Sequence, residues 1–334
     1  MAEQEAIAAA REERIGLVVG FLGIATGLFD FLRREGPHDP AEIASRTGLD
    51  SGYVKELCRA GFAFGYLEEE AGRFCLAAEA GLAGTGKGSS FLLAAIEAVF
   101  APSVALRLLP LFRTGVRPGP GALIDPELLP WFGRFLEEQH ASLFEEEILP
   151  ATALFAELAE EEGLVLDLGC GNGWLLRRLL RHLPRWRGIG IDREAARLAE
   201  GREAAREEEL DGRIEWIEAD LLSWSGPEKA RLVVVSRVVH HLWEDRRKLF
   251  ALLDRITRSD GAIFVWEPCW PEDLVSLRKP ARRSLAFQNL HEYAQGARLL
   301  SAEELIGAVE EAGWRAEADF FAGGAELVVA GRRK

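Results

Sequence analysis

The glycine-rich stretch LVLDLGCGNG, residues 164–173, constrains the fold of this 334-residue chain more than any other feature. An apolar run reaches Asp167, and Gly169, Gly171 and Gly173 then precede the helical pattern WLLRRLLRHL. Glycines allow a tight turn between a buried strand and a helix, and they let a ligand approach the main chain closely. Because Asp167 would repel a pyrophosphate, the loop favours a cationic or amine-bearing ligand over a dinucleotide.

After residue 163 the sequence alternates between strand-like and helical patterns. Alternation of this kind indicates a largely parallel, doubly wound sheet that helices cover on both faces. The last two strands follow each other closely through AGGA, so we expect them to form an antiparallel hairpin at the sheet edge. The seven predicted strands are 164–168, 188–192, 213–217, 231–236, 261–266, 314–321 and 326–331.

The first 86 residues have the pattern of a winged helix-turn-helix. Helical segments are followed by YLEEEAGRFCLA, which is typical of two short strands around a turn. Such modules often bind DNA, yet residues 39–86 hold four basic and eight acidic side chains, a net charge of −4. A surface of this sign releases no counterions from phosphates, so a DNA-binding regulator is the disfavoured alternative.

We expect three segments along the chain. They are a helical, winged-helix dimerisation domain at 1–86, a helical connector that walls a substrate pocket at 87–150, and the ligand-binding catalytic domain at 151–334. The connector is interrupted by a Pro/Gly-rich loop at 117–130. The uncharged stretch 15–29 is too short for a membrane helix of about 20 residues, and we expect it to pack against another subunit.

The composition favours a small-molecule partner. With 40 basic and 54 acidic residues the chain has a formal net charge of −14, and this charge repels nucleic acid and anionic membranes alike. The four cysteines lack CxxC spacing, which argues against a disulfide framework or a structural zinc site and predicts a reducing, cytoplasmic location.

Acidic residues follow the second and third predicted strands. A carboxylate at Asp192 can accept hydrogen bonds from both hydroxyls of a ribose. Asp220 can accept from an adenine amino group, with Leu221 packing on the ring. The carboxyl ends of parallel strands gather at one edge of an open sheet, and that edge is where we expect the active site.

The motifs DLGCGNG, GIGIDRE, EADLL and VVVSRVVHHLWED resemble, in order and spacing, the class I S-adenosylmethionine-dependent methyltransferases. With the winged-helix module in front, the chain is similar to the dimeric small-molecule O-methyltransferases. The resemblance implies a Rossmann-like seven-stranded sheet, a homodimer whose amino-terminal helices exchange between subunits, and S-adenosylmethionine as cofactor. It implies cofactor contacts from Asp167, Gly169, Cys170, Gly171, Asp192, Arg193, Asp220, Leu221, Ser236 and Arg237.

The same resemblance places His240 where these O-methyltransferases carry their general base. A histidine with an ordinary pKa of about 6.5 suits removal of a hydroxyl proton. Glu267 lies where the family has a carboxylate that orients the base. The family's further acidic partner is absent, because Ala297 stands at about its place, and His241 replaces an aspartate.

A narrower resemblance links the histidines to phenylpyruvate C-methyltransferases, which bind non-haem iron through a His-Asp pair and a later histidine. It implies a divalent metal, iron or zinc, on His240, His241 and His291, and C-methylation of a 2-oxo acid. Adjacent residues on a regular strand point to opposite faces, so a shared ion requires a turn. In a third alternative, His240 only closes the strand and His241 caps the next helix.

Overall fold

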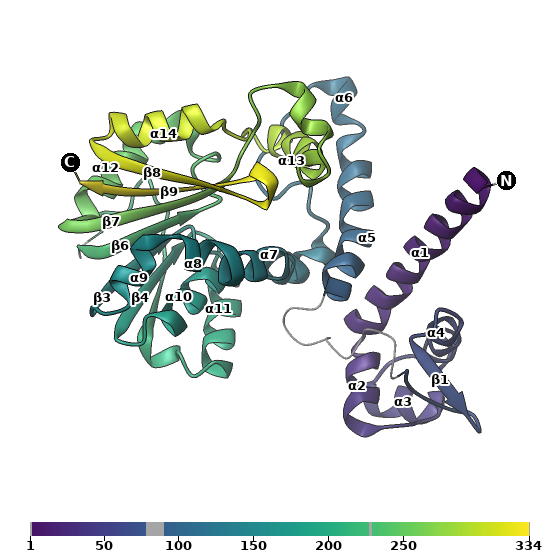
Figure 1. Cartoon of the computed structure of the whole chain (residues 1–334). Coiled ribbons are helices and arrows are strands. Elements are labelled where there is room, and N and C mark those ends of the chain that lie inside the picture. The colour runs from purple at the N-terminus through teal and green to yellow at the C-terminus, as the bar shows by residue number, and fades with distance from the viewer. Residues whose placement is uncertain (1, 78–89, 227–228, 334) are drawn as a thin grey trace. The chain divides into compact units, whose positions relative to one another are not determined.

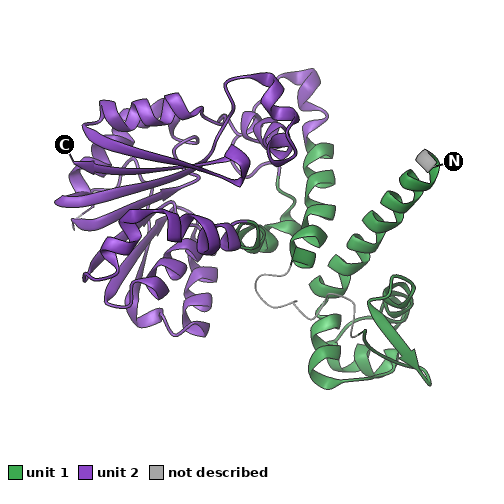
Figure 2. Ribbon diagram, in the orientation of Figure 1, with its two compact units in different colours: residues 1–107, 124–139 green, residues 108–123, 140–334 purple. Residues whose placement is uncertain are grey.

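The computed structural model describes residues 2–77, 90–226 and 229–333, and it divides into two compact units. One unit comprises residues 1–107 and 124–139, and the other comprises residues 108–123 and 140–334 (Figure 2). The predicted boundary between residues 86 and 87 lies outside the described residues.

The larger unit is built on a seven-stranded sheet of order β5-β4-β3-β6-β7-β9-β8 (Figure 1). The first five strands of this order are parallel, and β9 pairs antiparallel with both β7 and β8. The predicted Rossmann-like fold is confirmed. The final hairpin also forms, although of its two strands only β8 lies at an edge of the sheet and β9 lies inside it. The strands are β3 (Gly163–Leu168), β4 (Trp186–Asp192), β5 (Ile214–Glu218), β6 (Ala230–Ser236), β7 (Thr257–Pro268), β8 (Trp314–Phe321) and β9 (Glu326–Arg333).

Apolar residues cover both faces of the sheet, because successive side chains of a strand point to opposite sides. Val234 of β6 joins one core with Phe155 of α9, whereas its neighbour Val235 joins the other with Leu253 of α12. Burial on both faces is the reason that these strands are continuous apolar runs. The helices around the sheet are α9 (Ala153–Leu158), α10 (Trp174–His182), α11 (Ala195–Glu207), α12 (Arg246–Ile256) and α14 (Ala302–Glu311).

Two further helical regions belong to this larger unit. The chain around α6 (Leu111–Thr114) continues into a loop that packs on α13 (Arg283–Ala294), where Arg117 Nε donates to the Tyr293 carbonyl at 2.6 Å. The second begins with the last turn of α7 (Leu129–Leu143), whose residues up to 139 belong to the smaller unit, and continues through a π-helical turn, Phe144–Ile148, into α8 (Leu149–Ala151).

The smaller unit contains the predicted winged-helix module. A capping box between Asp39 and Glu42 starts its third helix, and Gly48, with φ +74°, ends it. Leu28, Ile43, Val54, Cys58 and Leu67 form part of its buried core. Its elements are α1 (Ala2–Ala25), α2 (Leu28–Glu35), α3 (Pro40–Thr47), α4 (Ser51–Ala63), β1 (Leu67–Glu70), β2 (Arg73–Leu76) and most of α5 (Ser90–Leu108).

Within the described residues, the helical stretch Ser90–Thr114 is long and apolar enough to cross a membrane, judged by length and composition alone. The bent pair Gln4–Ala25 and Leu28–Glu35 meets the same criteria if it is counted as one span. Buried helices of soluble proteins also meet them, so this is weak evidence for a membrane span.

Candidate active site

The glycine loop between β3 and α10 leaves open space above its central residue. Gly169, Gly171 and Gly173 all have left-handed φ angles, of +71°, +56° and +64°. A Cβ on Gly169 would come within 2.4 Å of Val238, and one on Gly173 would come equally close to Trp216. A Cβ on Gly171 would meet nothing within 4 Å. Gly171 is therefore required by the backbone conformation, and the space beside it can receive a ligand.

Asp192, at the end of β4, is tied directly to this loop. The Gly171 amide donates to Asp192 Oδ2 at 2.8 Å, and the Glu194 amide donates to Oδ1 at 2.9 Å. Each carboxylate oxygen has a second lone pair, so the fixed carboxylate can still accept hydrogen bonds from a diol. The neighbouring Arg193 is largely exposed and pairs with Glu194.

The other predicted cofactor residues differ in their surroundings. Asp220 is exposed, and its Oδ1 accepts the Leu222 amide at 2.8 Å, which leaves Oδ2 for another donor. Leu221 and Ser236 are half-buried, the latter as the last residue of β6. Cys170 is buried, and burial raises the pKa of its thiol well above the usual range, so it is no nucleophile.

Asp167, which precedes the glycine loop, is a buried acid that is only 2% exposed. Burial, assisted by the charge of Asp192, raises the pKa of Asp167 to about 7. A carboxylate that is costly to ionise in the free protein becomes favourable when a cationic ligand lies beside it. The ammonium or sulfonium of S-adenosylmethionine is a ligand of this kind.

This geometry predicts a pH-dependent affinity for the cofactor. Protonation of Asp167 removes the charge that attracts the ligand, so affinity should fall about tenfold per pH unit below pH 7 and level off above about pH 8. Isothermal titration with S-adenosylmethionine and S-adenosylhomocysteine checks this. Asp167→Asn should bind weakly at every pH, while the exposed control Asp211→Asn keeps the wild-type profile. An Asp167→Asn protein with unchanged affinity contradicts the assignment.

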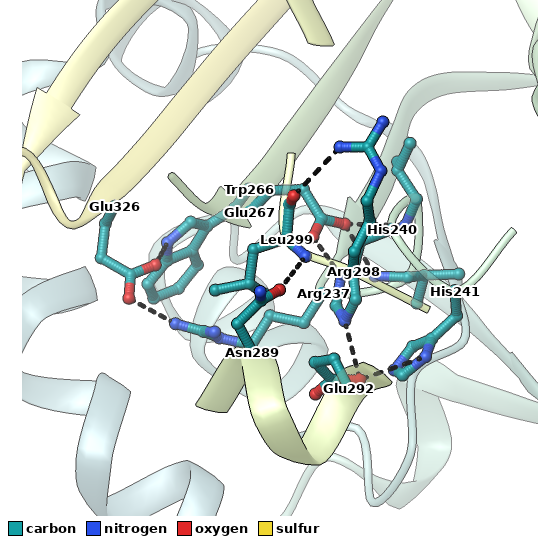
Figure 3. A network of polar contacts seen from close by, with 12 residues as sticks. Arg237, His240, His241, Trp266, Glu267, Asn289, Glu292, Arg298, Leu299 and Glu326 are labelled. Carbon is teal, nitrogen blue, oxygen red and sulfur yellow. Dashed lines mark hydrogen bonds and ion pairs between the residues drawn. The ribbon is translucent and has the colours of Figure 1, made fainter. Parts of the chain in front are cut away.

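The two histidines lie on a turn and not on a regular strand. After β6 ends, Arg237 adopts a left-handed φ of +57°, and the amides of His241 and Leu242 both donate to the Val238 carbonyl. The imidazole rings of His240 and His241 are 4.1 Å apart between centroids (Figure 3). A shared ion on His240 and His241 requires a turn, and the structure has one at this place.

Glu267 of β7 organises this turn. Its residue is 1% exposed, and Oε1 accepts the amides of Val238 at 2.8 Å and Val239 at 2.7 Å. Oε2 contacts His240 Nδ1 at 2.5 Å. This contact places the proton of the imidazole on Nδ1, and Nε2 of the buried ring has no hydrogen bond to any described residue.

Glu292 of α13 is a site residue that the sequence did not single out. Its Oε2 lies 3.6 Å from His240 Nε2 and 3.6 Å from His241 Nδ1, and it accepts the side-chain amide of Gln295 at 3.1 Å. The donor atoms that lie within 4.8 Å of one another come from His240, His241 and Glu292, and His291 is not among them. Adjacent residues of a helix point about 100° apart, and no motif shows which one faces inward.

The charges around the histidines have opposite effects on the two rings. Burial alone lowers the pKa of His240, but the carboxylates of Glu267 and Glu292 outweigh it and raise the pKa to about 9. Burial and the charge of His240 lower the pKa of His241. Burial would raise the pKa of Glu292, and the facing imidazoles bring it below its usual range. These shifts favour the charged form of His240 and the neutral form of His241 in the free protein.

Arg237 points away from the glycine loop, toward β9. Its Nη2 donates to Glu326 Oε1 at 2.5 Å, and Trp266 Nε1 donates to Glu326 Oε2 at 2.8 Å (Figure 3). The backbone amide of Arg237 donates to the Trp266 carbonyl at 2.8 Å. The guanidinium is thus engaged in an ion pair beside the sheet, and Glu326 is a second residue that the sequence did not single out.

Residues 165–261 match a family model described as a methyltransferase domain. A trans-aconitate 2-methyltransferase of Azoarcus sp. is 28% identical over 133 residues, covering 40% of this chain and 50% of that protein. An uncharacterized methyltransferase of Mycobacterium bovis is 33% identical over 101 residues, covering 30% of this chain and 48% of that protein. The chain spans about half the length of these curated relatives.

Solved structures match the whole chain at low identity. An O-methyltransferase family protein from Burkholderia thailandensis has 19% identity and a TM-score of 0.69, with 100% of this chain and 98% of that chain covered. An aminoriboflavin dimethyltransferase of Streptomyces davawensis has 18% identity and a TM-score of 0.70, with both chains fully covered. Human N-acetylserotonin methyltransferase, solved with S-adenosylmethionine, has 18% identity and a TM-score of 0.68. The match covers 100% of this chain and 98% of that chain.

These matches confirm the predicted class I methyltransferase fold and the amino-terminal helical module. Residues 165–261 match a methyltransferase domain, and the similar human N-acetylserotonin methyltransferase was solved with S-adenosylmethionine, the cofactor expected here.

Proposed function

We propose that the protein transfers a methyl group from S-adenosylmethionine to an oxygen of a small-molecule acceptor, with His240 as the general base. The observation that carries this proposal is the buried contact between His240 and Glu267 at the carboxyl edge of the sheet. The dyad is joined to the glycine loop, because Val238 of the same turn occupies the space beside Gly169.

The residues of the chain support an in-line displacement. When bound, S-adenosylmethionine supplies a methyl group on a positively charged sulfur. In the deprotonated form of the His240 ring, Glu267 holds the remaining proton at Nδ1, so Nε2 can accept the hydroxyl proton of the acceptor. Transfer of that proton to His240 Nε2 would leave the acceptor oxygen free to bond the methyl carbon while the carbon–sulfur bond of the cofactor would break. Asp167 and Asp192 position the cofactor through its cationic and ribose groups.

The printed names of the similar proteins favour small acceptors but include more than one acceptor atom. One is an O-methyltransferase family protein, and another is a dimethyltransferase of an aminoriboflavin. Oxygen is our lead because a base is needed to remove a hydroxyl proton, and a buried imidazole held by a carboxylate meets that need. The acceptor we expect is an aromatic or acidic metabolite with a hydroxyl group.

Loss of the base should reduce turnover without loss of the cofactor. His240→Gln and Glu267→Gln should each lower kcat by roughly 10²-fold to 10⁴-fold, the range of general-base catalysis. Transfer of labelled methyl from S-adenosylmethionine to a panel of small phenols and hydroxy acids measures this. His182→Gln changes an exposed histidine at the end of α10 and is the control. Full activity of His240→Gln with an acceptor hydroxyl would overturn the base role.

A second candidate function is metal-dependent C-methylation of a 2-oxo acid. One donor atom each from His240, His241 and Glu292 lies within 4.8 Å of the others, and His240 Nε2 is buried without a hydrogen bond. Two imidazoles and one carboxylate suit iron or zinc, and the contact of Glu267 with His240 Nδ1 is the outer support that metal-binding histidines commonly have. A bound ion would supply a Lewis acid for the 2-oxo acid.

Metal analysis separates the two candidates. If the cluster binds an ion, tag-free protein incubated with iron(II) or zinc should retain one per chain by elemental analysis. His241→Ala and Glu292→Gln should then lose it, and His291→Gln should keep it. A wild-type protein without stoichiometric metal under these conditions rules out the C-methylation candidate and leaves O-methylation in place.

We also propose that the smaller unit mediates homodimerisation. Helix α1 presents Ile7, Ile15 and Leu22 with exposed fractions of 64%, 44% and 45%. Their spacing of eight and seven residues places them on one helical face, which suits burial against a second copy.

Light scattering after gel filtration tests this surface. The wild-type chain should elute as a dimer, and the double variant Ile15→Glu/Leu22→Glu should elute as a monomer because two charges would be buried at the contact. Glu12→Gln/Glu13→Gln alters the same helix without adding buried charge and should remain dimeric. A monomeric wild type at micromolar concentration contradicts this proposal.

A further inference from the structure

The turn that carries the histidines depends on one unusual backbone conformation. Arg237 has a φ of +57°, in a region that arginine rarely adopts because its Cβ crowds the carbonyl oxygen. The conformation reverses the chain after β6, so that the next two amides, those of Val238 and Val239, both point at Glu267 Oε1. An ordinary extended Arg237 would continue the strand and separate these groups.

Three contacts oppose the strain at Arg237. Its amide donates to the Trp266 carbonyl, its guanidinium donates to Glu326 Oε1 at 2.5 Å, and the guanidinium carbon lies 5.9 Å from the Trp266 ring centre. Glu326 is itself fixed by the indole of Trp266 at 2.8 Å. The side chains of Arg237 and Glu326 are only 14% and 10% exposed, so the charged pair is shielded from water.

Conformations of this kind persist only where the surrounding structure enforces them, and they are common at functional sites. From these contacts we infer that the Arg237–Glu326 ion pair is a positioning device for methyl transfer. It stabilises the left-handed turn that brings Glu267 and His240 together. Both residues act through the turn, and neither is assigned a contact with the reacting atoms.

The same turn couples the base to the cofactor loop. Val238 lies one residue after Arg237, and its Cγ2 fills the position next to Gly169, 2.4 Å from where a Cβ would be. A shift of the turn therefore moves a side chain that contacts the cofactor loop as well as the amides that bind Glu267. The ion pair supports both halves of the proposed reaction site through a single backbone segment.

The inference rests on the proposed role of His240, but its test requires no enzymatic activity. The decisive comparison is between the double variants Arg237→Gly/Glu326→Gln and Arg237→Ala/Glu326→Gln. Both lack the ion pair and leave no unpaired buried charge, and they differ by one methyl group. Glycine adopts positive φ without strain, whereas alanine does not.

Two readouts report the turn in these variants. Amide hydrogen exchange of Val238 and Val239 reports its opening, and the far-downfield proton signal of His240 Nδ1, assigned by its loss in His240→Gln, reports the contact with Glu267. The alanine variant should exchange about fivefold to thirtyfold faster than the glycine variant and should lose the signal, whereas the glycine variant retains it. Glu209→Ala, at an exposed residue that also has a φ of +57°, is the control.

The outcomes are distinct from a failure of the proposed function. Equal exchange and an intact signal in both double variants would overturn the inference, because the turn would then need no support at Arg237. Loss of the signal in both would also overturn it, because the ion pair would then act by something other than backbone conformation. Loss of the His240 Nδ1 signal in Glu209→Ala would show that the effect is not specific to Arg237, and would also overturn the inference. An inactive protein with the predicted exchange pattern would instead contradict only the role of His240.

Discussion

The carboxylate of Glu267 is the interaction on which the site depends. A buried ionised group is costly unless its lone pairs are satisfied, and here two backbone amides and one imidazole satisfy them. These three donors come from Val238, Val239 and His240, so the carboxylate fixes a continuous segment of chain. It sets both the course of the backbone after β6 and the orientation of one ring.

The rest of the site follows from that arrangement and from the sheet. Parallel strands β3, β4, β6 and β7 end at one edge, which places the glycine loop beside the histidine turn. Asp192 is bonded to the loop through Gly171, and Val238 packs against Gly169. The charges are also complementary, because the acidic loop suits a cationic cofactor while the paired carboxylates favour an imidazolium at His240 in the free protein.

The features that could be predicted from the sequence are set by neighbouring residues or belong to a motif. Most of the strands were predictable because they are short apolar runs between turn residues, and the glycine loop identified the ligand-binding edge. The proximity of Glu267 to His240 came from the resemblance to a family and from no spacing rule. The described geometry brings the two side chains together, while their roles stay predictions.

The residues that the sequence did not reveal depend on long-range packing. Glu292 faces the histidines instead of His291 because α13 has one particular rotation, and neither composition nor periodicity specifies it. Glu326 meets Arg237 because β9 pairs with β7 in a register that aligns Glu326 with Pro268. The positive φ of Arg237 has no sequence signature, since arginine is an uncommon residue in that conformation.

The most direct test of the account is a crystal structure of the protein with S-adenosylhomocysteine. The ligand should lie over Gly171 with its ribose on Asp192. His240, held through Nδ1 by Glu267, should face the sulfur with its Nε2 across the space for an acceptor. A ligand bound elsewhere, or an imidazole turned away from the sulfur with the Glu267 contact broken, would contradict it.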